Sequence, residues 1–73
     1  MVSIVLKTVG INKIEVIKIV RESTGLELKE AEDVVEKVEK GIPFEMYVLT
    51  ENVDDILKAL TAAGAVAINS IAE

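Results

Sequence analysis

Basic and acidic side chains carry most of the chemistry that this sequence can offer near neutral pH. The 73 residues include 8 Lys and Arg against 13 Asp and Glu, and they contain no His and no Cys. Such a chain has no imidazole general base, no thiolate nucleophile and no thiolate zinc site. The carboxylates also lack the spacing of an EF-hand. We therefore expect a protein that is not an enzyme and that holds no metal or cofactor.

Three basic residues alternate with apolar residues in a segment whose pattern predicts a helix. At about 100° per residue from Lys13, Ile17 lies near 40°, Arg21 near 80°, Ile14 near 100° and Lys18 near 140°. The apolar arc of this helix spans about 220°, whereas packing on a sheet needs only about 100°. We therefore predict that Ile14 and Ile17 are exposed among the three cations.

A second interpretation of this helix stays open. Ile14 or Ile17 could pack beneath the next helix, which would leave no apolar patch on the surface. The two cations that follow them in the helix would then belong to a solvated face. They could pair there with Glu15 or Glu22.

The charge is distributed unevenly along the chain. Residues 1–21 carry four positive charges and one negative charge, whereas residues 22–73 carry four positive and twelve negative charges. A basic edge with apolar residues suits an acidic partner protein, because opposite charge steers the encounter and apolar contact adds burial. The net charge of −5 and the presence of only two aromatic residues, Phe44 and Tyr47, argue against direct binding of nucleic acid.

Alternation and helical spacing divide the chain into six elements. They predict strands over residues 2–9, 42–49 and 65–71 and helices over residues 13–23, 28–40 and 51–63. Asn12 and Glu15 have the spacing of a capping box at the start of the first helix, and Gly25 is placed to end it. The order β-α-α-β-α-β predicts a single α+β domain over residues 1–73. Its helices should cover one face of a three-stranded sheet, with the first strand in the centre.

No targeting or membrane signal is visible in the sequence. No segment reaches the roughly 20 apolar residues of a membrane span, and no secretory signal begins the chain. We therefore expect a cytoplasmic protein that does not contact a membrane.

Residues 4–31, with the sequence IVLKTVGINKIEVIKIVRESTGLELKEA, resemble the C-terminal domain of the bacterial ribosomal stalk protein, the L-seven/L-twelve family. The tail ILKALTAAGA at residues 56–65 is similar to the corresponding end of that domain. The resemblance implies a two-layer fold in which three helices cover a three-stranded antiparallel sheet. It also implies a domain that recruits translation GTPases, the elongation and initiation factors.

In this family the contact surface lies on the first two helices of the domain. The positions that match the family pattern imply a set of contact residues in this chain. These are Lys13, Ile14, Ile17, Lys18, Arg21, Gly25, Leu26, Lys29 and Glu30. The first five are the residues that the helical wheel also selects.

Some positions depart from the family pattern. Glu27 stands where the family usually has Gly, and Glu32 stands where it has Lys. Both substitutions add negative charge that would oppose an acidic partner. Residues 42–49 are more apolar than the family's equivalent segment, and an exposed apolar edge strand favours self-association.

Two further expectations follow from the resemblance. The family's N-terminal dimerisation domain and its hinge are not among these 73 residues, so the usual anchor to the stalk base is missing from the sequence. An alternative function on the same fold is that of an interaction module in another system, such as a protease adaptor. Such an adaptor would need an acidic pocket for an α-amino group, and no motif for one is visible.

Overall fold

Within residues 2–69, which a computed structural model describes, the chain folds into three strands and three α-helices in the predicted order. The elements are β1 (Val2–Thr8), α1 (Lys13–Thr24), α2 (Leu28–Glu39), β2 (Phe44–Val48), a short 3-10 helix (Thr50–Asn52), α3 (Val53–Ala62) and β3 (Val66–Asn69). Each predicted element is present. The last residues of the predicted third strand, 70 and 71, lie outside the described residues.

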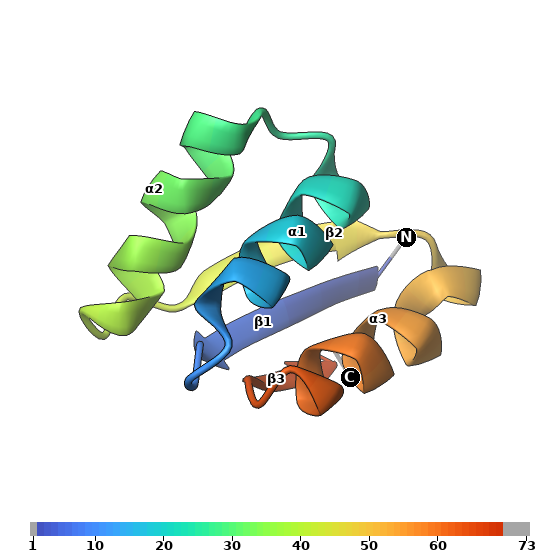
Figure 1. The fold of residues 1–73 in the computed structure, drawn as a ribbon. Coiled ribbons are helices and arrows are strands. Elements are labelled where there is room, and N and C mark those ends of the chain that lie inside the picture. Colours follow the sequence, from blue (N-terminus) through green and yellow to red (C-terminus); the bar gives the residue numbers. More distant parts are fainter. Residues whose placement is uncertain (1, 70–73) are drawn as a thin grey trace.

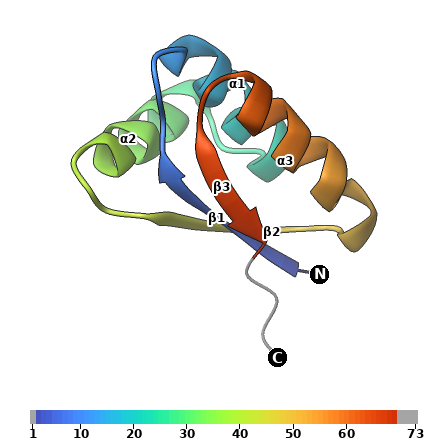
Figure 2. The ribbon, with the colours of Figure 1, turned by 90° about the horizontal axis from the view of Figure 1, so that it is seen from below.

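The sheet has the strand order β2-β1-β3, and β1 is antiparallel to both neighbours. Ile4 of β1 lies opposite Met46 of β2 on one side and opposite Asn69 of β3 on the other. All three helices cover the same face of the sheet (Figures 1 and 2). These findings confirm the predicted two-layer α+β fold and the central place of the first strand.

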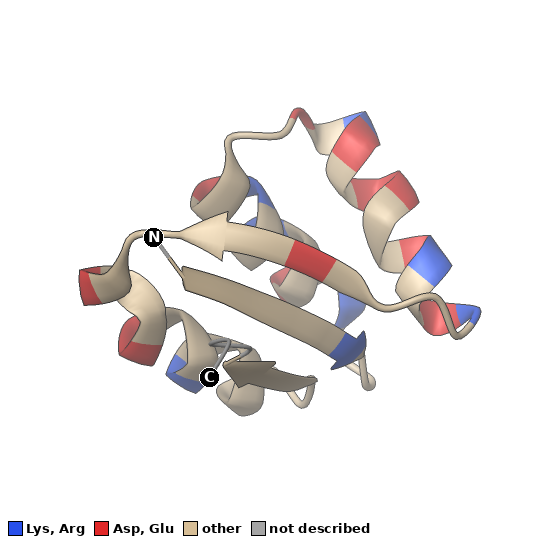
Figure 3. Cartoon of the chain, turned by 180° about the vertical axis from the view of Figure 1, so that it is seen from behind, with Lys and Arg blue, Asp and Glu red and all other residues tan. Residues whose placement is uncertain are grey.

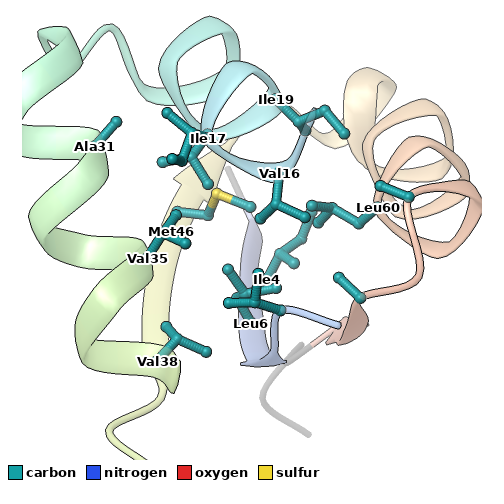
Figure 4. Packing of buried hydrophobic residues seen from close by; sticks show 14 of the residues in the cluster. Ile4, Leu6, Val16, Ile17, Ile19, Ala31, Val35, Val38, Met46 and Leu60 are labelled. Atoms are coloured by element: carbon teal, nitrogen blue, oxygen red, sulfur yellow. The ribbon is translucent and has the colours of Figure 1, made fainter. Parts of the chain in front are cut away.

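The core lies between the covered face of the sheet and the helices (Figure 4). Ile4 and Leu6 alternate on β1 and are fully buried, because a strand covered on one face turns every second side chain inward. Val16, Val35 and Leu60 are fully buried from the three helices. Burial of one such aliphatic side chain contributes about 1.5–3 kcal/mol. Each helix is therefore held on the sheet by its own apolar residues.

The ends of α1 and α2 differ in how their backbone groups are capped. Gly25 ends α1 as predicted, with φ of +78° and its N–H donating to the carbonyl oxygen of Arg21 at 2.9 Å. The capping box predicted at Asn12 is absent, because the Asn12 side chain makes no capping hydrogen bond and its backbone (ψ 62°) is not extended. A capping box forms instead at the start of α2. There Glu27, whose backbone is extended, and Glu30 each accept a backbone N–H from the other residue.

Two glycine turns are packed against each other. Gly10, between β1 and α1, has φ of +78°, and Gly64, between α3 and β3, has φ of +90°. A Cβ added to Gly10 would overlap the carbonyl oxygen of Gly64 and would lie 2.8 Å from its carbonyl carbon. The backbones of the two turns approach each other too closely for any side chain at position 10.

Part of the segment predicted to self-associate is exposed. β2 lies at an edge of the sheet. Met46 and Val48 are buried in the core, whereas Ile42, Tyr47 and Leu49 are exposed. Self-association through residues 42–49 stays a prediction.

Candidate protein-binding surface on α1 and α2

Three side chains form a line along the outer side of α1. Ile14, Lys18 and Arg21 are separated by four and three residues, so they are neighbours on one helix face. All three are exposed, and the exposed fraction of Ile14 is 82%. Val16 and Val20 on the other side of α1 are buried. Ile14, Lys18 and Arg21, which we call the α1 stripe, therefore face outward.

Ile17 does not belong to the exposed surface that the sequence pattern predicted. It is only 8% exposed and is part of the core cluster. Figure 4 shows its side chain pointing toward α2, on the side of Ala31 and Met46. The prediction was wrong because α2 covers the flank of α1 that carries Ile17. The alternative interpretation holds for Ile17, whereas Ile14 is exposed as predicted.

Lys13 is paired with carboxylates of α2. Its Nζ lies 3.2 Å from Oε1 of Glu39 and 3.9 Å from Oε2 of Glu36. The side chains in both pairs are more than one-third exposed, so each pair contributes at most about 1 kcal/mol. Within residues 2–69 neither Lys18 nor Arg21 is held in an ion pair. Both cations of the α1 stripe are therefore available to an acidic partner.

A shallow depression of about 420 Å³ lies at the end of α1. It is lined by Lys18, Arg21, Glu22, Gly25 and Leu26, and we call it the turn depression. Four of its five residues belong to the predicted contact set, so the structure brings them together. Glu22 was not selected from the sequence. Its place four residues after Lys18, on the same helix face, is the signal that could have found it.

Hydrogen bonds fix the backbone of the turn depression. Oγ1 of Thr24 donates to the carbonyl oxygen of Val20 at 2.6 Å and accepts the N–H of Leu26 at 3.2 Å. Leu26 is partly buried and packs against the core. A partner would therefore meet a surface that is already ordered, which lowers the entropic cost of binding. The sequence reasoning did not select Thr24 for this role.

The predicted contact residues on α2 are also at the surface. Lys29 and Glu30 are exposed, although the carboxylate of Glu30 takes part in the capping box. Glu27 is exposed and Glu32 is partly exposed, so both departures from the family pattern add negative charge that solvent can reach. Figure 3 shows mostly acidic bands along α2 and both basic and acidic bands on α1. The candidate surface thus joins a basic helix face to an acidic one.

The part of the chain that the structure describes has neither a metal-binding cluster nor a membrane-spanning helix. Residues 2–69 contain no group of three or more His, Cys, Asp or Glu side chains that could hold a metal ion. None of the helices in this range is both long enough and apolar enough to cross a membrane. The arrangement that the structure does offer is two free cations, an exposed Ile and an ordered turn. This combination suits the binding of an acidic, apolar protein surface.

The fold and this surface define a small α+β domain with a basic, apolar helix face. The family described as the ribosomal protein L7/L12 C-terminal domain matches residues 2–68. The chain belongs to this family, and the resemblance drawn from residues 4–31 and 56–65 is confirmed. None of the solved structures compared with the chain matches it.

Curated relatives carry the name large ribosomal subunit protein bL12. The protein from Dehalococcoides mccartyi is 52% identical over 63 residues, which cover 86% of this chain and 50% of the relative. The protein from Thermotoga maritima is 52% identical over 65 residues, which cover 85% of this chain and 49% of the relative. The protein from Coprothermobacter proteolyticus is 49% identical over 63 residues, which cover 86% of this chain and 49% of the relative. The chain therefore spans about half the length of the curated relatives that it matches.

Proposed function

We propose that this domain binds translation GTPases, the elongation and initiation factors, through the α1 stripe and the turn depression. It would do so as part of a ribosomal stalk in the cytoplasm. Membership of the L7/L12 family and the names of the relatives support a role on the ribosome. The observation that carries the proposal is the α1 stripe itself. There the 82% exposed Ile14 is followed along the helix by Lys18 and Arg21, which are in no ion pair among the described residues.

The chemistry of the stripe suits an acidic partner surface with an apolar centre. The guanidinium of Arg21 is able to pair with a carboxylate through two parallel hydrogen bonds, and Lys18 adds a point charge beside it. Ile14 and Leu26 supply the apolar contact. Opposite charge raises the rate of association more than it raises affinity. A surface this small predicts a weak and short-lived complex, with an interface below about 1,200 Å². A domain that repeatedly captures and releases factors needs such a complex.

The proposal is tested by titrating the ¹⁵N-labelled domain with a purified bacterial elongation factor. The amide shifts should change at Ile14, Lys18, Arg21 and Leu26. Lys18→Glu or Arg21→Glu should weaken binding by about tenfold or more, because each reversal replaces an attraction with a repulsion. For a complex this weak, such a loss abolishes detectable binding.

The matched control is Lys58→Glu, which makes the same charge reversal at an exposed residue of α3. It should leave the affinity within about twofold, because screening at physiological salt limits the effect of a charge beyond about 8 Å. Absence of shift changes, or changes confined to residues 44–49, would rule the proposal out.

A further inference from the structure

A second concave surface lies between α1, the end of β2 and the start of α3. It is a groove of about 450 Å³, which is within the range of about 300–1,000 Å³ that ligand sites occupy. Ile19 and Val48 are buried at its floor, and Ile56 and Ala59 of α3 line its wall. These residues make the interior of the groove apolar.

The charged side chains that line this groove are both acidic. Glu22 comes from α1 and Asp55 from α3, and both residues are exposed. Among the described residues, neither carboxylate is held in an ion pair and no Lys or Arg lines the groove. We call this surface the acidic groove. Its sign is opposite to that of the α1 stripe, so an acidic partner is repelled here and a basic one is attracted.

The rim of the acidic groove adds an exposed aliphatic side chain. Leu49 is 52% exposed, so it still has apolar surface to lose to a ligand. Tyr47 alternates with the buried Met46 and Val48, so its side chain leaves β2 on the face of the sheet that the helices do not cover. A guanidinium group is able to pair with a carboxylate through two parallel hydrogen bonds. An exposed leucine beside two carboxylates and above an apolar floor therefore fits arginine next to a large apolar residue.

We propose that the acidic groove is a docking site for a basic peptide segment of another protein, in which Arg stands next to Leu or a similar apolar residue. Charge complementarity selects this occupant, because the lining offers carboxylates and apolar atoms and no cation. The groove uses α3 and β2, which the α1 stripe does not. Glu22 is the one residue that borders both surfaces. The domain could thus hold an acidic partner and a basic segment at the same time.

The test uses two hexapeptides with blocked ends. One has the sequence Gly-Arg-Leu-Arg-Leu-Gly, and in the other Glu replaces each Arg. Titration of the ¹⁵N-labelled domain with the arginine peptide should give saturable shift changes at Leu49, Asn52 and Asp55. The glutamate peptide should give none, because the carboxylates of the groove repel it.

A pair of neutralising variants isolates the carboxylate. Asp55→Asn should weaken binding of the arginine peptide by about threefold, which is the value of one exposed ion pair. Asp54→Asn is the matched control, since Asp54 is the preceding residue in the first turn of α3 and does not line the groove. It should change the affinity by less than about 1.5-fold. Both carboxylates interact with the same helix N-terminus, so the two variants should fold with similar stability.

Four results would overturn the proposal. The first is the absence of saturable changes up to millimolar peptide. The second is changes centred on the turn depression, and the third is equal weakening by the two Asp variants. The fourth is concentration-dependent shifts at the groove without peptide, which would show that a second copy of the chain is the occupant.

Discussion

The contact between the two glycine turns leads to a sharp prediction about stability. Gly10 and Gly25 have the same φ of +78°, but their surroundings differ. A Cβ at Gly25 meets nothing within 4 Å, whereas a Cβ at Gly10 overlaps the backbone of Gly64. Gly10→Ala and Gly25→Ala therefore share one source of strain, and only the first adds a clash.

The size of each effect follows from these two sources. The left-handed conformation costs an alanine about 1–2 kcal/mol, and this is the whole effect expected at Gly25. At Gly10 the obstructing atoms are backbone atoms of a turn, which cannot rotate away. Overpacking of this kind adds about 1–3 kcal/mol. Gly10→Ala should therefore cost about 2–5 kcal/mol, out of a total stability of about 4–11 kcal/mol for a domain of this length.

Urea unfolding followed by circular dichroism measures the difference. With an m-value of about 1 kcal/mol/M, the midpoint should fall by about 1–2 M for Gly25→Ala and about 2–5 M for Gly10→Ala. Gly41→Ala is a further control, because it too has a positive φ and no atom within 4 Å of the added Cβ. Equal midpoints for Gly10→Ala and Gly25→Ala would refute the reasoning, since the close approach of the two turns would then carry no energetic penalty.

Two other variants test the burial and capping described above by the same unfolding measurement. Ile17→Ala should destabilise the domain by about 2–5 kcal/mol, because it removes buried core volume. Ile14→Ala should change stability by less than about 0.5 kcal/mol, since Ile14 is exposed. An equally small loss for Ile17→Ala would contradict the burial of Ile17. Glu27→Ala should lower the free energy of unfolding by about 1 kcal/mol, because it removes the cap of α2. Glu27→Ser should retain most of the stabilisation that this cap provides. No loss in Glu27→Ala would mean that the capping box is not formed in solution.

The fold follows closely from the pattern of apolar residues. Alternation at Ile4 and Leu6 and helical spacing at Ala31, Val35 and Val38 are set by which side chains face the core, and these residues are all buried. Element ends are less predictable, because they depend on backbone geometry. Asn12 is of a favoured capping residue type, yet it lacks the extended conformation that a cap needs.

The candidate surface could be predicted only in part. Ile14, Lys18 and Arg21 lie in adjacent places on the helical wheel, and the structure leaves all three exposed. On the helical wheel Ile17 lies between these exposed residues and the buried Val20, where only the position of α2 decides between surface and core. The residue pattern of α1 does not contain the position of α2, since that position arises from tertiary packing between the two helices. The pairing of Lys13 with Glu36 and Glu39 depends on the same packing.

The central place of β1 has a consequence for how the domain is made. β1 is the first strand to leave the ribosome, yet Ile4 pairs with Met46 and Asn69, which are synthesised much later. Pairings between residues so far apart in sequence slow folding. Until β3 emerges, one edge of β1 has no partner in the sheet and is open to strands of other chains. The nascent domain therefore keeps its central strand incompletely paired until its last strand has emerged.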